Sequence, residues 1–246
     1  MFEQQRVKFL GVILENGTVQ MDPVKVKGVV DWSPLQNAMD ICSFLGFTGF
    51  YWYFIPNYSL IAHPLIQLTW KNVAFQWDTA CTEAFEHLKS LMCAKPILWQ
   101  PDYTKVFFLA TDASAYGMGA VLSQEGELNP RTQKPMLCPI AYYSNTFMPA
   151  EQNYDINERE FLGVLKALRC FRPHVAATEI PVTILTDHAN LTHWKATRKV
   201  NRHVARWFSE LQDYNLIIKH MPGKIHTAPD MLSRPPGANH GERDNS

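Results

Sequence analysis

The chain has 246 residues, a length that suffices for one large domain or two ordinary domains with a sizeable core. Its composition, 46% hydrophobic and 19% charged residues, is that of a globular protein. Its 23 basic and 23 acidic residues give a formal net charge of zero, which excludes a global electrostatic attraction to nucleic acid and leaves that role to local basic surfaces. The five cysteines form no C-x-x-C pair, which argues against a disulfide framework or a zinc site, so we expect reduced core thiols in an intracellular protein.

Residues 6–20 predict a β-hairpin, because strand-type side chains flank Asn16-Gly17, a strong two-residue turn signal. A helix over residues 23–30 follows, since Pro23 suits the first helical position.

Asn37 suits the cap of a second helix, with Asp40 in its first turn, and this helix ends before Pro56. Apolar residues at helical spacing predict another helix over residues 79–92, which Pro96 stops.

Residues 41–70 contain no Asp, Glu, Lys or Arg, whereas a membrane span needs about 20 consecutive apolar residues. Polar residues, prolines and glycines interrupt this stretch, and Pro56-Asn57 divides it. We therefore expect two aromatic-rich helices of a soluble protein with no membrane contact. Residues 1–8 are polar and of mixed charge, unlike a secretory signal.

The pattern changes to strands after a boundary near residues 96–105. The expected order is three strands, a helix, a strand, two helices, a strand and a short helix, over residues 106–110, 118–123, 137–144, 157–171, 181–186, 190–196, 201–214, 215–220 and 229–233. This order predicts a mixed sheet with helices packed on its faces. The tail, residues 235–246, has little to bury, so we expect it to be disordered.

Four acidic residues of the second half each lie beside or within an apolar segment: Asp112, Glu160, Asp187 and Asp230. An ionised carboxylate without a partner is very unfavourable in a low-dielectric interior. Converging carboxylates are explained by a hard cation such as Mg2+, which takes oxygen ligands. The leading hypothesis is therefore a metal-dependent nuclease site.

Glu158 competes with Glu160 for the second position of this site. The two are separated by about 200° around a helix, so only one can face the site. Glu160 directly precedes the apolar run 161–168, whereas Glu158 suits a solvated charge in the first turn. We favour Glu160.

A basic stripe lies between Asp187 and Glu210, where no other acid occurs: Lys195, Arg198, Lys199, Arg202 and Arg206. The three arginines are four residues apart and share one helical face, opposite the apolar residues Val200, Val204, Trp207, Phe208 and Leu211. Such a face is either simply solvated or, next to a metal site, a contact for phosphates that weakens as salt rises.

Several motifs of the second half occur in a characteristic order: Phe108–Ser114, Asn153-Tyr154, Glu158–Leu162, Ile184–Asp187, Pro222–Lys224 and Ala228–Arg234. Together they resemble the ribonuclease H domain of gypsy-type LTR retrotransposon polyproteins, and the resemblance covers residues 75–234.

The first part resembles the segment that precedes this domain in the same polyproteins. Val7–Gly11 is similar to the primer-gripping hairpin at the end of the polymerase palm, and residues 40–56 are similar to the reverse transcriptase thumb. By this resemblance Gly46 and Phe50 would face the minor groove of a primer–template duplex. The alternative for both is ordinary helix packing.

The resemblance implies a mixed α+β fold: a small, mostly helical thumb with a β-hairpin at its start, then a ribonuclease H-like, mixed five-stranded sheet flanked by helices. The expected division is residues 1–22 (end of the palm), 23–95 (thumb), 96–234 (ribonuclease H-like) and 235–246 (tail). The aspartates of the palm do not occur in this sequence. We therefore expect a polyprotein fragment that cannot polymerise DNA unaided.

In that family four acids hold two divalent metal ions, and the matching positions here are Asp112, Glu160, Asp187 and Asp230. The implied cofactor is Mg2+, with Mn2+ as a substitute. Metal binding should depend on pH, because clustered carboxylates repel one another and take up protons.

His220 matches a mobile histidine of retroviral relatives that helps the product leave. His226 competes for this role, and a surface histidine with no role is the alternative for each. Pro229 departs from the small residue usual before the last acid. It restricts Ala228 and removes a backbone donor.

The implied activity is endonucleolytic hydrolysis of the RNA strand of RNA–DNA hybrids. The implied partners are the hybrid, a primer–template duplex, and the palm of the same polyprotein or a second subunit. We expect a cytoplasmic particle or the nucleus as the location. One alternative is a non-enzymatic nucleic-acid-binding remnant of a decayed or co-opted retroelement; another is a different metal-dependent phosphotransferase.

Overall fold

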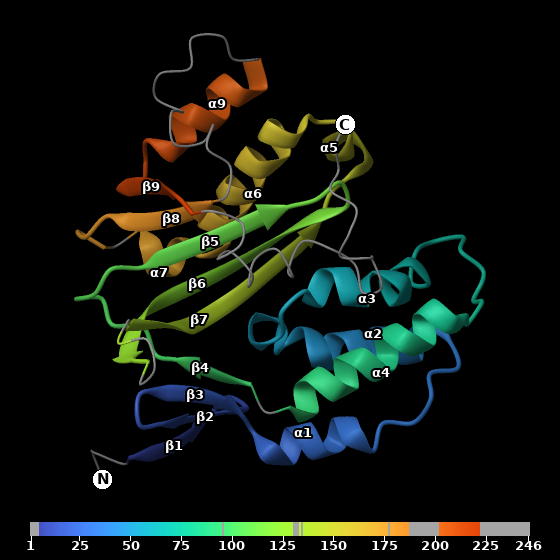
Figure 1. Ribbon diagram of the computed structural model, residues 1–246. Helices are drawn as coiled ribbons and strands as arrows, with labels where there is room; N and C mark the ends of the chain where they lie inside the picture. The colour runs from blue at the N-terminus through green and yellow to red at the C-terminus, as the bar shows by residue number, and fades with distance from the viewer. Residues whose placement is uncertain are drawn as a thin grey trace.

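Two β-sheets organise the computed structural model, which describes residues 5–94, 96–129, 133, 135–176, 178–186 and 202–221 (Figure 1). We call residues 5–99 the N-terminal part and residues 102–221 the C-terminal part. The helices expected over 190–196 and 229–233, and the tail, lie outside the described residues.

The first sheet has four antiparallel strands in the order β1 (Arg6–Phe9), β2 (Val12–Glu15), β3 (Thr18–Met21) and β4 (Ile97–Trp99). The predicted turn is confirmed: Asn16 and Gly17 have φ angles of 48° and 73°, as a two-residue hairpin turn requires. The prediction of one hairpin was incomplete, because a second turn at Leu10-Gly11 (φ 46° and 84°) adds a strand.

Helices fill the rest of the N-terminal part: α1 (Pro23–Val30), α2 (Ala38–Gly49), the 3-10 turn η1 (Trp52–Phe54), α3 (Tyr58–Gln67) and α4 (Thr79–Cys93). The predicted cap of α2 is confirmed, since Asn37 Oδ1 accepts a hydrogen bond of 2.9 Å from Asp40 N. The predicted break at Pro56-Asn57 separates η1 from α3. Among the described residues, none of the helices combines the length and apolar character needed to cross a bilayer.

The core of the N-terminal part lies between the first sheet and these helices. Phe44 and Phe54 are fully buried in it, together with Leu88 of α4 and Leu98 of β4. The short strand β4 thus brings the chain that leaves α4 back to the hairpins at the start of the sequence.

The second sheet has five strands in the order β7-β6-β5-β8-β9: β7 (Pro135–Thr146), β6 (Gly117–Leu128), β5 (Phe108–Ala113), β8 (Val182–Thr186) and β9 (Leu216–His220). The pairs β7–β6 and β6–β5 are antiparallel, whereas β5–β8 and β8–β9 are parallel. The expected mixed five-stranded sheet is therefore confirmed.

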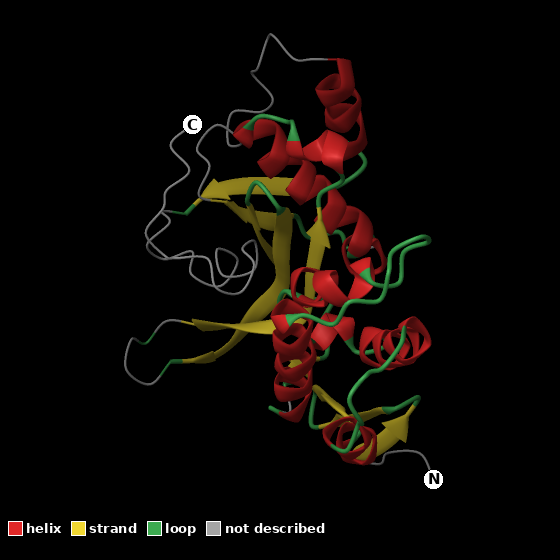
Figure 2. Ribbon diagram, turned by 90° about the vertical axis from the view of Figure 1, so that its right-hand side faces the viewer, coloured by secondary structure: helices red, strands yellow, loops and turns green. Residues whose placement is uncertain are grey.

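Four described helices accompany this sheet: α5 (Pro149–Gln152), α6 (Ile156–Cys170), α7 (Arg172–Val175) and α9 (Arg202–Leu211). In Figure 2 the described helices lie to one side of the sheet, with α6 against it. The apolar side of α6 explains this packing, because its residues Phe161, Leu162, Leu165 and Leu168 are buried against the strands.

The two parts pack directly against each other along β7. Ser59 of α3 hydrogen-bonds Ser144 of β7, and the ring of Trp52 meets that of Tyr143 edge-on at 6.0 Å. Tyr53 packs against the cores of both parts. The C-terminal part is thus supported by the helices that precede it.

Candidate active site

Asp112 lies near the end of β5, the central strand of the second sheet, where it pairs with Gly119 of β6. Side chains alternate along a strand, so Asp112 shares a face with Ala110, and Ala113 lies on the other face. The Asp112 residue is only 7% exposed. The apolar run before it therefore carries a carboxylate into a buried position at the strand end, as the sequence predicted.

Glu160 reaches the same strand end from α6. The side chain of Asp155 caps this helix by accepting a hydrogen bond from Glu158 N at 2.8 Å, which fixes where its first turn begins. Glu160 is 3% exposed, and its Oε1 accepts a 3.1 Å hydrogen bond from the backbone N–H of Ala113. The fold thus places the buried Glu160 carboxylate next to Ala113, the residue that follows the buried Asp112.

Glu158 lies elsewhere. Its carboxylate faces back toward the N–H of Asp155, at 3.4 Å, in a capping box of the first helical turn. Between the two competing glutamates, the structure therefore brings Glu160, and not Glu158, to the end of β5.

The other two predicted acids, Asp187 and Asp230, lie outside the described residues. The described part of β8 ends at Thr186 and runs parallel to β5, with Leu185 opposite Ala110. Within the residues that the structure describes, no three His, Cys, Asp or Glu side chains gather as metal ligands.

His220 ends β9 and is exposed, opposite Thr186 of β8 in the parallel register. Carboxyl ends of parallel strands meet at one edge of a sheet, so His220 lies at the edge that also carries the end of β5. Its competitor His226 falls outside the described residues, as does Pro229.

The donor set at the end of β5 suits a hard divalent cation. Asp112 and Glu160 offer carboxylate oxygens, the ligands that Mg2+ prefers. Both residues are buried, and burial of an ionised carboxylate calls for a compensating positive charge, which a cation supplies. These residues therefore fit a magnesium site.

The basic stripe is described only in part, because Lys195, Arg198, Lys199 and the side chain of Arg202 lie outside the described residues. Arg206 is exposed on α9. The opposite face is apolar as predicted: the rings of Trp207 and Phe208 lie 5.9 Å and 4.9 Å from that of Phe161 on α6.

An ion pair that the sequence analysis missed ties α9 to α6. Arg169 donates to both carboxylate oxygens of Glu210, with Nε–Oε1 2.6 Å and Nη2–Oε2 2.5 Å. The guanidinium group lowers the pKa of Glu210. The two residues are 41 positions apart, so only the tertiary fold reveals their pairing.

Gly46 and Phe50 are both exposed near the end of α2. A side-chain carbon added at Gly46 would meet nothing within 4 Å, so no packing contact requires glycine there. Positions four apart share one helical side. The pair therefore forms an open surface, although its contact with a duplex stays a prediction.

Comparison with known proteins identifies relatives for nearly the whole chain. Residues 102–214 match the family described as "RNase H-like domain found in reverse transcriptase". The transposon Tf2-3 and Tf2-4 polyproteins of Schizosaccharomyces pombe are 33% identical over 235 residues, which cover 95% of this chain. The chain spans only 17% of the length of these relatives.

Solved structures show the same fold at lower identity. The foamy viral protease-reverse transcriptase dRH in complex with double-stranded DNA aligns with a TM-score of 0.73 and 20% identity, over 89% of this chain and 38% of that chain. The foamy viral protease-reverse transcriptase in complex with an RNA/DNA hybrid aligns with a TM-score of 0.72 and 19% identity, over 98% of this chain and 32% of that chain.

Proposed function

The chain belongs to the reverse transcriptase and RNase H-like segment of LTR retrotransposon polyproteins, and on this premise we propose that it hydrolyses the RNA strand of RNA–DNA hybrids endonucleolytically. The observation that carries the proposal is that two buried acidic residues, Asp112 and Glu160, lie at the end of β5, where Glu160 Oε1 accepts a hydrogen bond from the N–H of Ala113, the residue after Asp112. By the family resemblance, Asp112 and Glu160 occupy the positions of two of the four metal ligands.

The proposed cofactor is a pair of Mg2+ ions, or Mn2+ in their place, held by Asp112, Glu160, Asp187 and Asp230. When bound, such a pair would supply activation of a water molecule and stabilisation of the leaving oxygen of an in-line displacement. The protein's own contribution is to aim the ligands. The Ala113 N–H holds one oxygen of Glu160, and burial keeps most water away from both Asp112 and Glu160.

The proposed substrate contacts lie on both parts of the chain. Arg206, with Arg198 and Arg202, would bind phosphates, while Gly46 and Phe50 would lie along the minor groove of a primer–template duplex. Recognition of RNA would use its 2′-hydroxyl groups. Support comes from the similar fold of the foamy viral enzymes, which were solved with double-stranded DNA and with an RNA/DNA hybrid.

The test is cleavage of an end-labelled RNA–DNA hybrid by the purified chain with Mg2+, compared with the Asp112→Asn variant. We expect RNA fragments with 5′-phosphate and 3′-hydroxyl ends from the unmodified chain and a loss of about 100-fold or more in the variant, since even outer partners of metal ligands are worth about 10–100-fold. Cleavage that survives Asp112→Asn would discard the assigned site.

The second candidate function is nucleic-acid binding without catalytic activity, as in a remnant of a retroelement. The exposed Arg206 and the open surface at Gly46 and Phe50 would also suit this function. Hybrid binding without cleavage in the same experiment would favour it. DNA polymerisation would require a palm from the same polyprotein or from a second subunit. We propose a cytoplasmic particle or the nucleus as the place of action.

A further inference from the structure

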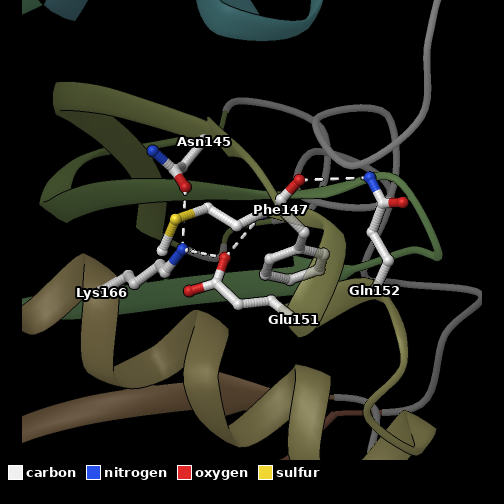
Figure 3. Close-up of polar contacts among 6 residues, drawn as sticks. Asn145, Phe147, Glu151, Gln152 and Lys166 are labelled. Carbon is white, nitrogen blue, oxygen red and sulfur yellow. Dashed lines mark hydrogen bonds and ion pairs between the residues drawn. The ribbon is translucent and has the colours of Figure 1, made fainter.

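A nearly buried ion pair lies away from the carboxylate site, between α5 and α6. Glu151 Oε2 and Lys166 Nζ are 2.7 Å apart, and their side chains are only 12% and 14% exposed (Figure 3). A buried ion pair loses much of its attraction to desolvation, so replacing it with apolar residues often leaves stability unchanged or raises it. Stability alone therefore does not explain why this pair is charged.

The contacts of the pair join three segments to α6. Lys166 Nζ also donates to Asn145 Oδ1 of β7 at 2.9 Å and lies 5.4 Å from the centre of the Phe147 ring. Glu151 Oε2 also accepts a 2.9 Å hydrogen bond from the backbone N–H of Met148. One side chain of α6, that of Lys166, thus holds three segments: the last residues of β7, the loop after it and α5 (Figure 3).

Lys166 lies on the same helix as Glu160, six residues further along. That separation is about 9 Å along the helix axis and about 240° around it. A contact at Lys166 that holds α6 against β7 therefore fixes both the height and the rotation of the helix. Height and rotation decide where the Glu160 carboxylate lies relative to the N–H of Ala113.

We propose that Glu151 and Lys166 are positioning residues for the carboxylate site: their buried ion pair holds α6 so that Glu160 is aimed at the end of β5 before a metal ion binds. This inference rests on the proposed function, because it assigns the pair a role in binding the divalent cation. The pair touches neither cation nor substrate, and it acts through Glu160.

The test is the double variant Glu151→Gln/Lys166→Met, measured by calorimetric titration with Mn2+ alone. The double change leaves no lone buried charge, and glutamine can still accept the bond from Met148 N. We expect Mn2+ affinity to fall roughly tenfold, as for outer partners of metal ligands. We also expect kcat for hybrid cleavage to fall with KM nearly unchanged, and the thermal midpoint to stay close to that of the unmodified chain.

The matched control is Arg169→Met/Glu210→Gln, which removes another ion pair of α6 on the side that faces α9. It should leave Mn2+ affinity unchanged. Glu151→Asp alone keeps both charges and only shortens the side chain that reaches Lys166, so it is the milder change should the double variant not fold. It should weaken Mn2+ binding about threefold, a smaller effect than complete loss of the pair.

The outcomes separate the two proposals. An unmodified chain that neither binds Mn2+ nor cleaves hybrid would overturn the proposed function. A second result would contradict only the positioning role. If the unmodified chain binds Mn2+ and cleaves hybrid, but the variants at Glu151 and Lys166 bind Mn2+ as tightly as it does, the pair serves packing only. The same conclusion follows if the control at Arg169 and Glu210 loses as much Mn2+ affinity as these variants.

Discussion

Ser59 of α3 donates two hydrogen bonds to Ser144 of β7 across the boundary between the two parts of the chain. The N–H of Ser59 donates to Ser144 Oγ at 3.0 Å, and Ser59 Oγ donates to the backbone oxygen of Ser144 at 2.7 Å. A helix of the N-terminal part is thereby fastened to an edge strand of the ribonuclease H-like sheet.

Replacing Ser59 with alanine tests this contact. The Ser59→Ala variant should lower the free energy of unfolding by about 1–2 kcal/mol, because the backbone oxygen of Ser144 loses its partner in a partly buried place. Urea unfolding followed by circular dichroism measures the change. Ser43→Ala is the control, since Ser43 is exposed and bonds only within its own helix, to Met39 O. Equal effects of both substitutions would show that the contact between the parts adds nothing.

Glu160 and Glu158 should differ sharply in activity. Glu160→Gln should reduce Mg2+-dependent hybrid cleavage by about 100-fold or more, because it removes a proposed metal ligand. Glu158→Gln should change the rate by less than about twofold, since glutamine preserves the capping box. Initial rates at saturating Mg2+ provide the measurement. A larger loss in the Glu158 variant would reverse the assignment.

Gly117 tolerates no side chain. A Cβ atom there would lie 2.6 Å from the backbone oxygen of Asn145 and 3.0 Å from Leu60 Cδ2 of α3. Gly117→Ala should therefore destabilise the protein by about 1–3 kcal/mol. Gly28→Ala, in α1 with nothing within 4 Å of the added carbon, should instead stabilise it by about 0.5–1 kcal/mol. Thermal unfolding of both variants measures these changes, and a Gly117 variant as stable as the parent would contradict close packing of β7 and α3 around this glycine.

His174 makes stability depend on pH. Burial lowers the pKa of His174 from its usual 6.5. Between the folded and unfolded pKa values the unfolded chain binds more protons, so stability falls as pH falls below about 6.5. The loss between about pH 7.5 and about pH 5.5 should be smaller in His174→Gln than in the parent, as urea midpoints at both pH values would reveal. Identical losses would exclude this histidine as a source.

Arg206 should contribute to nucleic-acid affinity through phosphate contact. Arg206→Ala should weaken hybrid binding for all sequences and reduce the slope of log affinity against log salt by about 1. Fluorescence anisotropy at several salt concentrations measures the slope. Lys27→Ala, an exposed change on α1, is the control. An unchanged slope in the Arg206 variant would show that Arg206 is only solvated and does not contact phosphates.

Local signals predicted much of the fold and of the candidate site. The cap at Asn37, the turn at Asn16-Gly17 and the apolar spacing of α4 and α6 all act within a few residues, so the sequence displays them directly. Asp112 and Glu160 could be predicted because each borders an apolar run that had to be buried.

Other features depend on contacts between distant residues. Leu10 gave no turn signal, because leucine rarely adopts the positive φ of 46° that it has here. The three residues of β4 are too few for a periodic pattern, and their pairing with β3 is a long-range contact. The bond between Lys166 and Glu151 spans 15 positions, so no helical or strand period connects them.

The placement of β4 governs how the chain can be divided for expression. Leu98, only 1% exposed, packs in the core of the N-terminal part, and Gln100 N bonds the oxygen of Gly17 at 2.8 Å. A cut before Ile97 would leave β3 as an unpaired edge strand and would leave the apolar strand β4, without its partner, on the C-terminal fragment. Both changes favour aggregation. A fragment of the N-terminal part should thus extend through Gln100, and a fragment of the C-terminal part should start beyond it.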